Sequence, residues 1–127
     1  MNTGRCYISG KISGLVDLGE TKFDTMENWL RLMYGTDADI VNPHKLPCNH
    51  DKRWESYMKV CIDELVRCQL VLAMDCWKKS RGASIEVLLA SVLGITLCKM
   101  ERGELVEFQL STWDKIKIGF KILLNRF

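Results

Sequence analysis

The sequence has little excess charge of either sign, no long apolar run and no closely spaced pair of cysteines. Lysine and arginine total 18 against 16 acidic residues, and the resulting net charge of +2 gives no chain-wide field that would draw the protein onto DNA or RNA. No apolar stretch approaches the roughly 20 residues that a membrane span requires. We therefore expect no nucleic acid polymer and no membrane among its partners, and any anion-binding site to be local.

The start of the chain and the cysteines indicate a cellular compartment. Residues 1–5 are polar and lack the apolar core of a signal peptide. The six cysteines include no C-x-x-C pair, and most lie in apolar periodic segments, as small hydrophobic residues do. These features predict a soluble, cytoplasmic protein with reduced thiols.

Short apolar runs alternate with segments of helical periodicity along the 127 residues. Strands are predicted at residues 6–9, 39–43, 70–74, 95–98 and 105–110, and helices at residues 20–34, 54–67, 83–93 and 111–127. With 47% apolar residues and no internal repeat, we expect the chain to form a single domain, residues 1–127. The alternation predicts an α/β three-layer sandwich with a parallel central sheet, which binds ligands at the carboxyl ends of its central strands.

The last predicted helix has more large apolar residues than are required to cover one small sheet. Ser111 is its expected N-cap, with Asp114 three residues on, close to the capping-box pattern. The face carries large side chains at Trp113, Ile116, Phe120, Leu123 and Phe127. We therefore expect the protein to form at least a dimer.

Two strand ends carry residues suited to a nucleotide-like ligand. The first strand, which contains Tyr7, ends in a turn whose two glycines permit close approach of the backbone to a ligand; the turn consists of Gly10, Lys11, Ile12, Ser13 and Gly14. The central strand is followed by Asp75, Trp77, Ser80, Arg81 and Gly82. Backbone N–H groups at the next helix N-terminus, with Ser80 and nearby cations, form a plausible phosphate site. The alternative is a solvated, charged loop.

Glu86 lies in the first turns of that helix and has two interpretations. The helix dipole stabilises a carboxylate there by roughly 0.3 to 1 kcal/mol, which is compatible with a purely structural role. Alternatively, a carboxylate held near a sugar attacks the anomeric carbon and forms a glycosyl-enzyme intermediate. The position of Glu86 at the ligand-binding edge favours the second interpretation.

Four motifs taken in order resemble the nucleoside 2-deoxyribosyltransferase-like superfamily. They are the run from Tyr7 to Gly14, the pair Asn42-Pro43, Trp54-x-x-Tyr57-Met58, and Trp77-x-x-Ser80-Arg81-Gly82-Ala83-x-x-Glu86. The chain is most similar to a family of small uncharacterised bacterial and phage-associated domains in that superfamily, over about residues 5–98. Its characterised relatives are deoxyribosyltransferases and deoxynucleoside monophosphate N-glycosidases, whose fold is flavodoxin-like and whose glutamate attacks C1′ of the sugar.

The resemblance implies roles for individual residues. Glu86 matches the nucleophile, Tyr7 its orienting hydroxyl, and Ser80 a phosphate or base contact. Lys11 and Ser13 stand where the monophosphate glycosidases bear a serine and an arginine, so a cation and a hydroxyl are kept in exchanged order. The relatives complete their pocket with residues of a neighbouring subunit, which again implies a homo-oligomer. No cofactor is expected.

One position departs from the family pattern. The relatives carry an acidic residue on the second helix, eight positions before an aspartate that opens the central strand. Counting back from Gln69 leads to Cys61. Asp63 is two residues further on, which rotates it by roughly 200° onto the opposite face of the helix. Cys61 lies on the apolar stripe and is interpreted as core packing rather than a reactive thiol, so protonation of the leaving base lacks its expected acid.

His44, Cys48 and His50 could suggest a metal site. The segment offers three ligands in an irregular H-x-x-x-C-x-H spacing, so we interpret it as a loop over the pocket and expect no metal.

Two functions therefore remain open. The first is an enzyme that cleaves or transfers the N-glycosidic bond of a nucleotide or deoxynucleotide, with Glu86 as nucleophile. The second is a non-catalytic sensor or interaction module that binds a nucleotide without turnover, which is consistent with the missing acid at Cys61.

Overall fold

The computed structural model describes residues 4–11, 16–46 and 53–127. Its strands are β1 (Cys6–Ser9), β2 (Ile40–Val41), β3 (Leu70–Ala73), β4 (Thr96–Glu101) and β5 (Glu104–Phe108). Its helices are α1 (Val16–Tyr34), α2 (Trp54–Leu65), α3 (Arg81–Val92) and α4 (Thr112–Leu124), with short 3-10 helices η1 (Pro43–Lys45) and η2 (Trp77–Lys79). The order of strands and helices that the periodicity predicts is confirmed, with boundaries that differ by a few residues.

The strands form one sheet in the order β2-β1-β3-β4-β5. The first four strands are parallel, and β1 pairs with β3 along its whole length, from Cys6 opposite Leu70 to Ser9 opposite Ala73. The turns that follow β1 and β3 therefore lie side by side at one edge of the sheet. This is the edge at which a parallel sheet binds its ligands.

The fifth strand corrects the prediction of a parallel sheet. β5 runs antiparallel to β4 and pairs with it from Leu97 opposite Phe108 to Glu101 opposite Glu104. Only Arg102 and Gly103 join the two strands, and both have positive φ angles, 51° and 77°. A two-residue turn of this kind makes a hairpin, because a parallel pair needs a crossover connection of a dozen or more residues.

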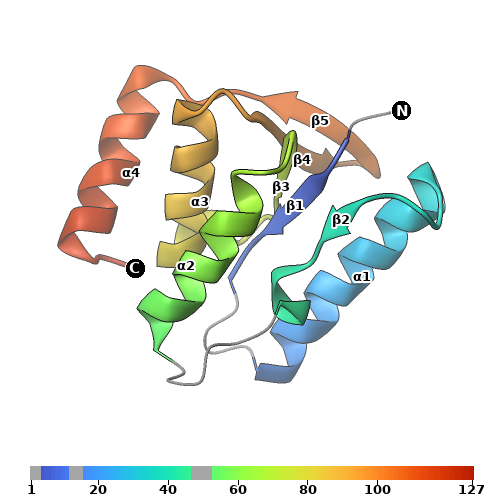
Figure 1. The fold of residues 1–127 in the computed structure, drawn as a ribbon. Helices are drawn as coiled ribbons and strands as arrows, with labels where there is room; N and C mark the ends of the chain where they lie inside the picture. Colours follow the sequence, from blue (N-terminus) through green and yellow to red (C-terminus); the bar gives the residue numbers. More distant parts are fainter. Residues whose placement is uncertain (1–3, 12–15, 47–52) are drawn as a thin grey trace.

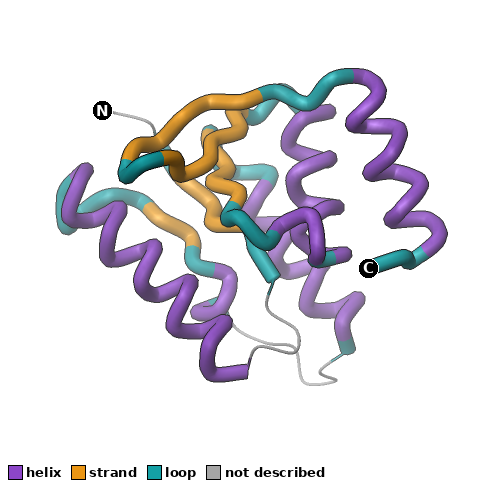
Figure 2. The backbone as a smooth tube through the Cα atoms, turned by 180° about the vertical axis from the view of Figure 1, so that it is seen from behind, coloured by secondary structure: helices purple, strands orange, loops and turns teal. Residues whose placement is uncertain are grey.

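Helices cover both faces of the sheet and make three layers, as Figure 1 and the reverse view in Figure 2 show. On one face, Phe23 and Leu30 of α1 pack against Ile8 and Leu72. On the other face, α2 and α3 bury side chains that include Cys61, Leu65, Ala83, Val87 and Ala90. Each strand residue takes its face from the alternation of side chains along the strand, so Tyr7 and Val71 face α2 and α3 while Ile8 and Leu72 face α1.

The outermost helix, α4, packs beside α3 (Figure 1). Ser111 is its N-cap and forms the expected capping box with Asp114. None of its residues is buried, and large apolar side chains on it are exposed. Among the described residues, no helix is long and apolar enough to cross a membrane.

Candidate functional site

Glu86 and two residues of β1 form a buried, hydrogen-bonded group between α3 and the sheet. The hydroxyl of Tyr7 donates to Oε2 of Glu86 at 2.5 Å, and the hydroxyl of Ser9 donates to Oε1 at 2.8 Å. Tyr7 and Ser9 are fully buried, and Glu86 is only 4% exposed. Each carboxylate oxygen therefore has its own hydroxyl donor inside the protein.

Local geometry explains why these three side chains meet. Tyr7 and Ser9 are two residues apart on a strand, so they face the same side of the sheet, which is the side that α3 covers. On α3, Glu86 shares the buried face of the helix with Ala83, Val87 and Ala90. Ala83 is buried in the same core cluster as Tyr7, and the Glu86 carboxylate reaches the hydroxyls of Tyr7 and Ser9 on β1.

Burial sets the protonation of this group. Burial raises the pKa of Glu86 to about 7, although the hydrogen bonds from Tyr7 and Ser9 favour the charged form. The pKa of Tyr7 lies well above its ordinary value, because of its own burial first and then of the Glu86 charge and the Cys61 thiol. Tyr7 therefore keeps its proton and acts as a donor. Catalytic carboxyl groups commonly have a pKa shifted toward neutral pH.

Cys61 completes the surroundings of Tyr7. It is 1% exposed, which confirms the predicted core packing, and it lies close enough to Tyr7 to help raise the pKa of the tyrosine. Asp63, as predicted, faces away from the core and forms an ion pair with Arg67 at 3.2 Å, with 61% of its side chain exposed. Position 61 thus places a buried thiol beside Tyr7.

The start of α3 supplies a hydroxyl and a cation. Ser80 is the N-cap of the helix and accepts a hydrogen bond from the backbone N–H of Ala83 at 3.1 Å. The guanidinium of Arg81 stacks on the ring of Trp54, with its carbon 4.5 Å from the ring centroid. The Nε of Arg81 is buried and has no hydrogen-bond partner within the described residues. A pre-positioned guanidinium with an unused donor is suited to an anion.

The turn after β1 reaches the segment after β3. The backbone N–H of Lys11 donates to Sγ of Cys76 at 3.4 Å, so the two loops that the sequence analysis selected are in contact. Gly10 is buried, and a Cβ there would overlap the end of the Met74 side chain, so this position requires glycine or a shift of Met74. Ile12, Ser13 and Gly14 lie outside the described residues.

The remaining residues predicted to contact a ligand are Asp75, Trp77 and Gly82, and they differ in how buried they are. Trp77 is 7% exposed and packs in the core on the α2 and α3 side, so most of its ring is unavailable to a ligand at the Glu86 site. Asp75 is exposed. Gly82 lies against α2, where a Cβ would come within 3.0 Å of Sδ of Met58. The absence of a side chain at Gly82 therefore lets α3 lie close to α2.

The sequence analysis included two further residues in its motifs but did not predict their contacts. Ser9 is the first, and its signal was available, since a residue two positions after Tyr7 on a strand must face the same side. The second is the buried Asn42, whose Nδ2 donates to Asp24 and Glu27 at 2.8 and 3.1 Å. The partners of both side chains lie on other segments of the chain.

Glu27 is a charged group held by several donors. Lys45 and Arg31 each approach its carboxylate at 3.0 Å. Burial alone would raise the pKa of Glu27, but the hydrogen bonds from Lys45, Asn42 and Arg31 hold it below its ordinary value. Because every member of this network has a partner, we interpret it as a structural clamp between α1 and η1.

The histidine and cysteine segment is described only at His44, because Cys48 and His50 lie outside the described residues. Within residues 4–11, 16–46 and 53–127, no group of three or more histidine, cysteine, aspartate or glutamate side chains is arranged to hold a metal ion.

The comparisons with known proteins give one match. The family model described as a domain of unknown function (DUF4406) matches residues 4–99, which include β1, the Glu86 site and most of β4. No curated protein and no solved structure matches the chain.

Proposed function

The chain belongs to the family described as a domain of unknown function (DUF4406), and we propose that it cleaves or transfers the N-glycosidic bond of a nucleotide or deoxynucleotide with Glu86 as nucleophile. The observation that carries the proposal is the buried Glu86 carboxylate, held by the hydroxyls of Tyr7 and Ser9 and titrating at about 7. A flavodoxin-like fold is part of the proposal. The strand order β2-β1-β3-β4-β5 supports it, because that is the order of flavodoxin-like sheets; the antiparallel direction of β5 is a departure from them.

The chemistry follows from the carboxylate. In the first step an oxygen of ionised Glu86 bonds to the anomeric carbon of the sugar, and the bond from that carbon to the base nitrogen breaks with its electron pair leaving on the base. In the second step water attacks the same carbon and restores the carboxylate, or a second base does so and the reaction is a transfer. Tyr7 and Ser9 hold the carboxylate in one orientation throughout.

The phosphate side of the substrate is assigned to the two loops that meet beside this group. Two cations are available there. Arg81 stacks on Trp54 and has an unused Nε donor, and Lys11 lies next to Cys76. Ser80 and the first backbone N–H groups of α3 lie at the positive end of the helix dipole. Local charge of this kind is compatible with a chain whose net charge is only +2.

One observation favours a second function, a nucleotide-binding module without turnover. A purine or pyrimidine leaves slowly unless a ring nitrogen is protonated, and the position that should supply an acid holds the buried thiol of Cys61. In this version Glu86 and Tyr7 bind the sugar hydroxyls and no bond breaks.

Incubation with a panel of nucleoside monophosphates and NAD, followed by chromatography for free base, tests the first function. We expect slow base release by the parent protein and none by Glu86→Gln, which keeps the size of the side chain and removes its charge. Glu104→Gln, at an exposed position of β5, is the matched control and should retain activity. If the parent binds nucleotide but releases no base from any compound, the binding module is the correct assignment.

A further inference from the structure

A second pocket lies on the far side of α3 from the Tyr7–Glu86 pair. Its volume is about 310 Å³, and η2, α3, the β4–β5 hairpin and α4 supply its walls. Ser84 lines this pocket while Glu86, two residues later, faces β1. Residues two positions apart on a helix are rotated by roughly 200° about its axis, so the two sites open on different sides of α3. The volume is within the range of small-molecule sites.

The wall of this pocket concentrates positive charge. Four lysines and one acidic residue line it: Lys78, Lys99, Lys117, Lys121 and Asp114. Four positive charges against one negative charge leave +3 here, whereas the whole chain carries only +2. Outside the lining, Glu101 approaches Lys99 at 3.8 Å, which offsets part of that charge.

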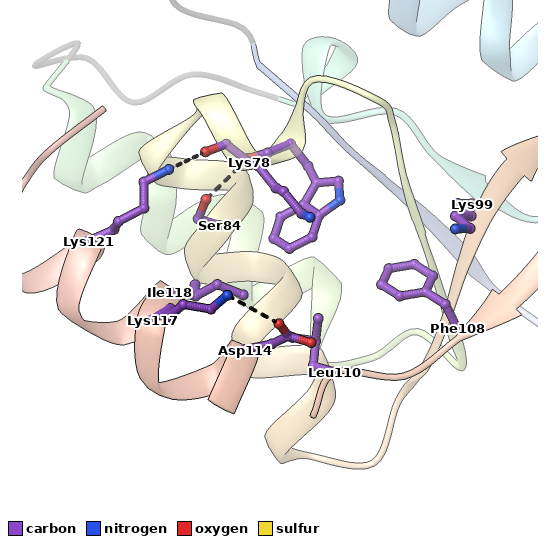
Figure 3. A pocket seen from close by; sticks show the side chains of 10 residues that line it. Lys78, Ser84, Lys99, Phe108, Leu110, Asp114, Lys117, Ile118 and Lys121 are labelled. Atoms are coloured by element: carbon purple, nitrogen blue, oxygen red, sulfur yellow. Dashed lines mark hydrogen bonds and ion pairs between the residues drawn. The ribbon is translucent and has the colours of Figure 1, made fainter. Parts of the chain in front are cut away.

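Existing contacts already hold several of these lysines over the pocket. Nζ of Lys121 donates to the backbone carbonyl of Lys78 at 2.8 Å, and this bond ties α4 to η2 (Figure 3). Lys117 reaches toward Asp114 at the loose distance of 3.9 Å. Because one carboxylate at that distance cannot neutralise four ammonium groups, an anion that enters the pocket would relieve their mutual repulsion.

The floor of the pocket is apolar and partly aromatic. Phe108, Leu110 and Ile118 line it together with the small exposed part of Trp77. Lys78 and Lys99 lie over the rings of Trp77 and Phe108, with Nζ 5.7 and 5.8 Å from the ring centroids. The cations thus border flat apolar surfaces, an arrangement that fits a flat ring with an anionic group at its edge.

We propose that this pocket binds a small ligand that combines a planar ring with a phosphate or carboxylate group, at a site separate from Glu86. The ring packs on Phe108 and Trp77, and the anion contacts the lysines of α4 and β4. A nucleotide and an aromatic carboxylate share this chemistry. Because η2 and α3 form one wall of the pocket and also carry Ser80 and Arg81, a ligand there contacts the segment that positions the first site.

Amide chemical shifts in NMR spectra test the proposal, with AMP, 2-naphthoate, adenosine and inorganic phosphate as separate probes on the wild-type protein and on Glu86→Gln. AMP or 2-naphthoate, or both, should move the signals of Lys78, Leu110 and Ile118, and should bind at least about tenfold more tightly than adenosine or phosphate alone. Comparison of AMP with 2-naphthoate shows whether the pocket prefers a nucleotide or an aromatic carboxylate. Shifts in this pocket that persist in Glu86→Gln support it even if the proposed reaction at Glu86 fails.

Charge-neutralising variants supply the second test. Lys99→Gln and Lys117→Gln should each weaken binding about five- to tenfold, on the scale of one charge-assisted contact. Lys59→Gln, at an exposed position of α2 that does not line the pocket, removes the same charge and should leave affinity within about twofold. The proposal is overturned if the pocket signals do not move, if phosphate alone binds as tightly as both ring-bearing anions, or if Lys59→Gln weakens binding as much as Lys99→Gln.

Discussion

The hydroxyl of Tyr7 donates a hydrogen bond of 2.5 Å to the carboxylate of Glu86, across 79 positions of the sequence. This bond links β1, at the centre of the parallel part of the sheet, to α3. With the bond from Ser9 it satisfies both oxygens of a carboxyl that would otherwise be buried without a partner. The same two bonds orient the group that the proposed reaction uses, so the stability of the fold and the proposed reaction depend on the same pair of hydrogen bonds.

The first prediction concerns the pH dependence of activity. Glu86 attacks only when ionised, and its pKa is about 7, so base release should rise through pH 7 and level off above it. Ser9→Ala removes a hydrogen bond that favours the charged form, so the midpoint should move to higher pH. Measurement of kcat/KM between about pH 5 and pH 9 gives the midpoint. Ser91→Ala, on the helix that carries Glu86, is the control. An unmoved midpoint in Ser9→Ala contradicts the assignment of the midpoint to Glu86.

The second prediction concerns stability. The pKa of Glu86 rises from 4.5 to about 7 on folding, so the folded protein binds a proton that the unfolded chain has lost over that interval. The stabilising contribution is therefore complete below about pH 4.5 and is lost as the pH rises through 7, by roughly 3 kcal/mol at most. Urea unfolding of the wild type and Glu86→Gln should show that their difference in unfolding free energy changes over this interval. A difference independent of pH would contradict the raised pKa.

The third prediction concerns phosphate recognition. Lys11→Ala or Arg81→Ala should weaken nucleotide binding by roughly 1.5 to 3 kcal/mol, the scale of a charged hydrogen bond, with little effect on the nucleoside. Arg81→Lys keeps the charge but loses the planar stack on Trp54, so we expect an intermediate loss. Calorimetry in the Glu86→Gln background avoids turnover. Equal losses for nucleotide and nucleoside would remove the phosphate assignment.

The fourth prediction concerns the missing acid. Because Cys61 is buried beside Tyr7, the carboxyl of Cys61→Asp should lie next to the Glu86 group and stay protonated near neutral pH. General acid catalysis contributes about 10²- to 10⁴-fold, so base release should increase while the melting temperature falls, since a polar group enters the core. Cys61→Asn is the matched control, having the same shape without an acidic proton. An equal increase in both variants would show that acidity is not the cause.

The fifth prediction concerns association. Trp113, Ile116, Phe120 and Leu123 make a stripe along α4 and are 63, 43, 61 and 83% exposed. In a two-fold dimer, this stripe on one copy would pack against the same stripe on the other copy. A second copy of this chain is therefore its expected partner. Light scattering at about 50 µM should show at least a dimer, and Phe120→Glu should give a monomer. Leu32→Glu, at a position of α1 that is 85% exposed, should have no effect. A monomeric wild type contradicts the prediction.

Local information in the sequence predicted the elements and part of the site. The continuously apolar run at β3 indicated a strand covered on both faces, and Ser111 with Asp114 indicated the start of α4; both are confirmed. The motif resemblance paired Tyr7 with Glu86, and the structure places them in contact. These features depend on periodicity, on neighbouring residues or on an ordered set of motifs, so a single sequence contains them.

Contacts between distant segments were decided only by the tertiary structure. The direction of β5 depended on the hairpin at Arg102 and Gly103, and the role of Ser9 on how closely α3 approaches β1. The sequence grouped Trp77 with the residues around Glu86, but only the tertiary structure showed that most of its ring lies in the core and that it also lines the lysine pocket. The lysine pocket joins residues of η2, β4 and α4, which become neighbours only when the hairpin and α4 pack beside α3. Periodicity assigns a side chain to a face of its own element, but the partner of that face depends on sheet order and helix packing, because those are set by the burial of all elements together.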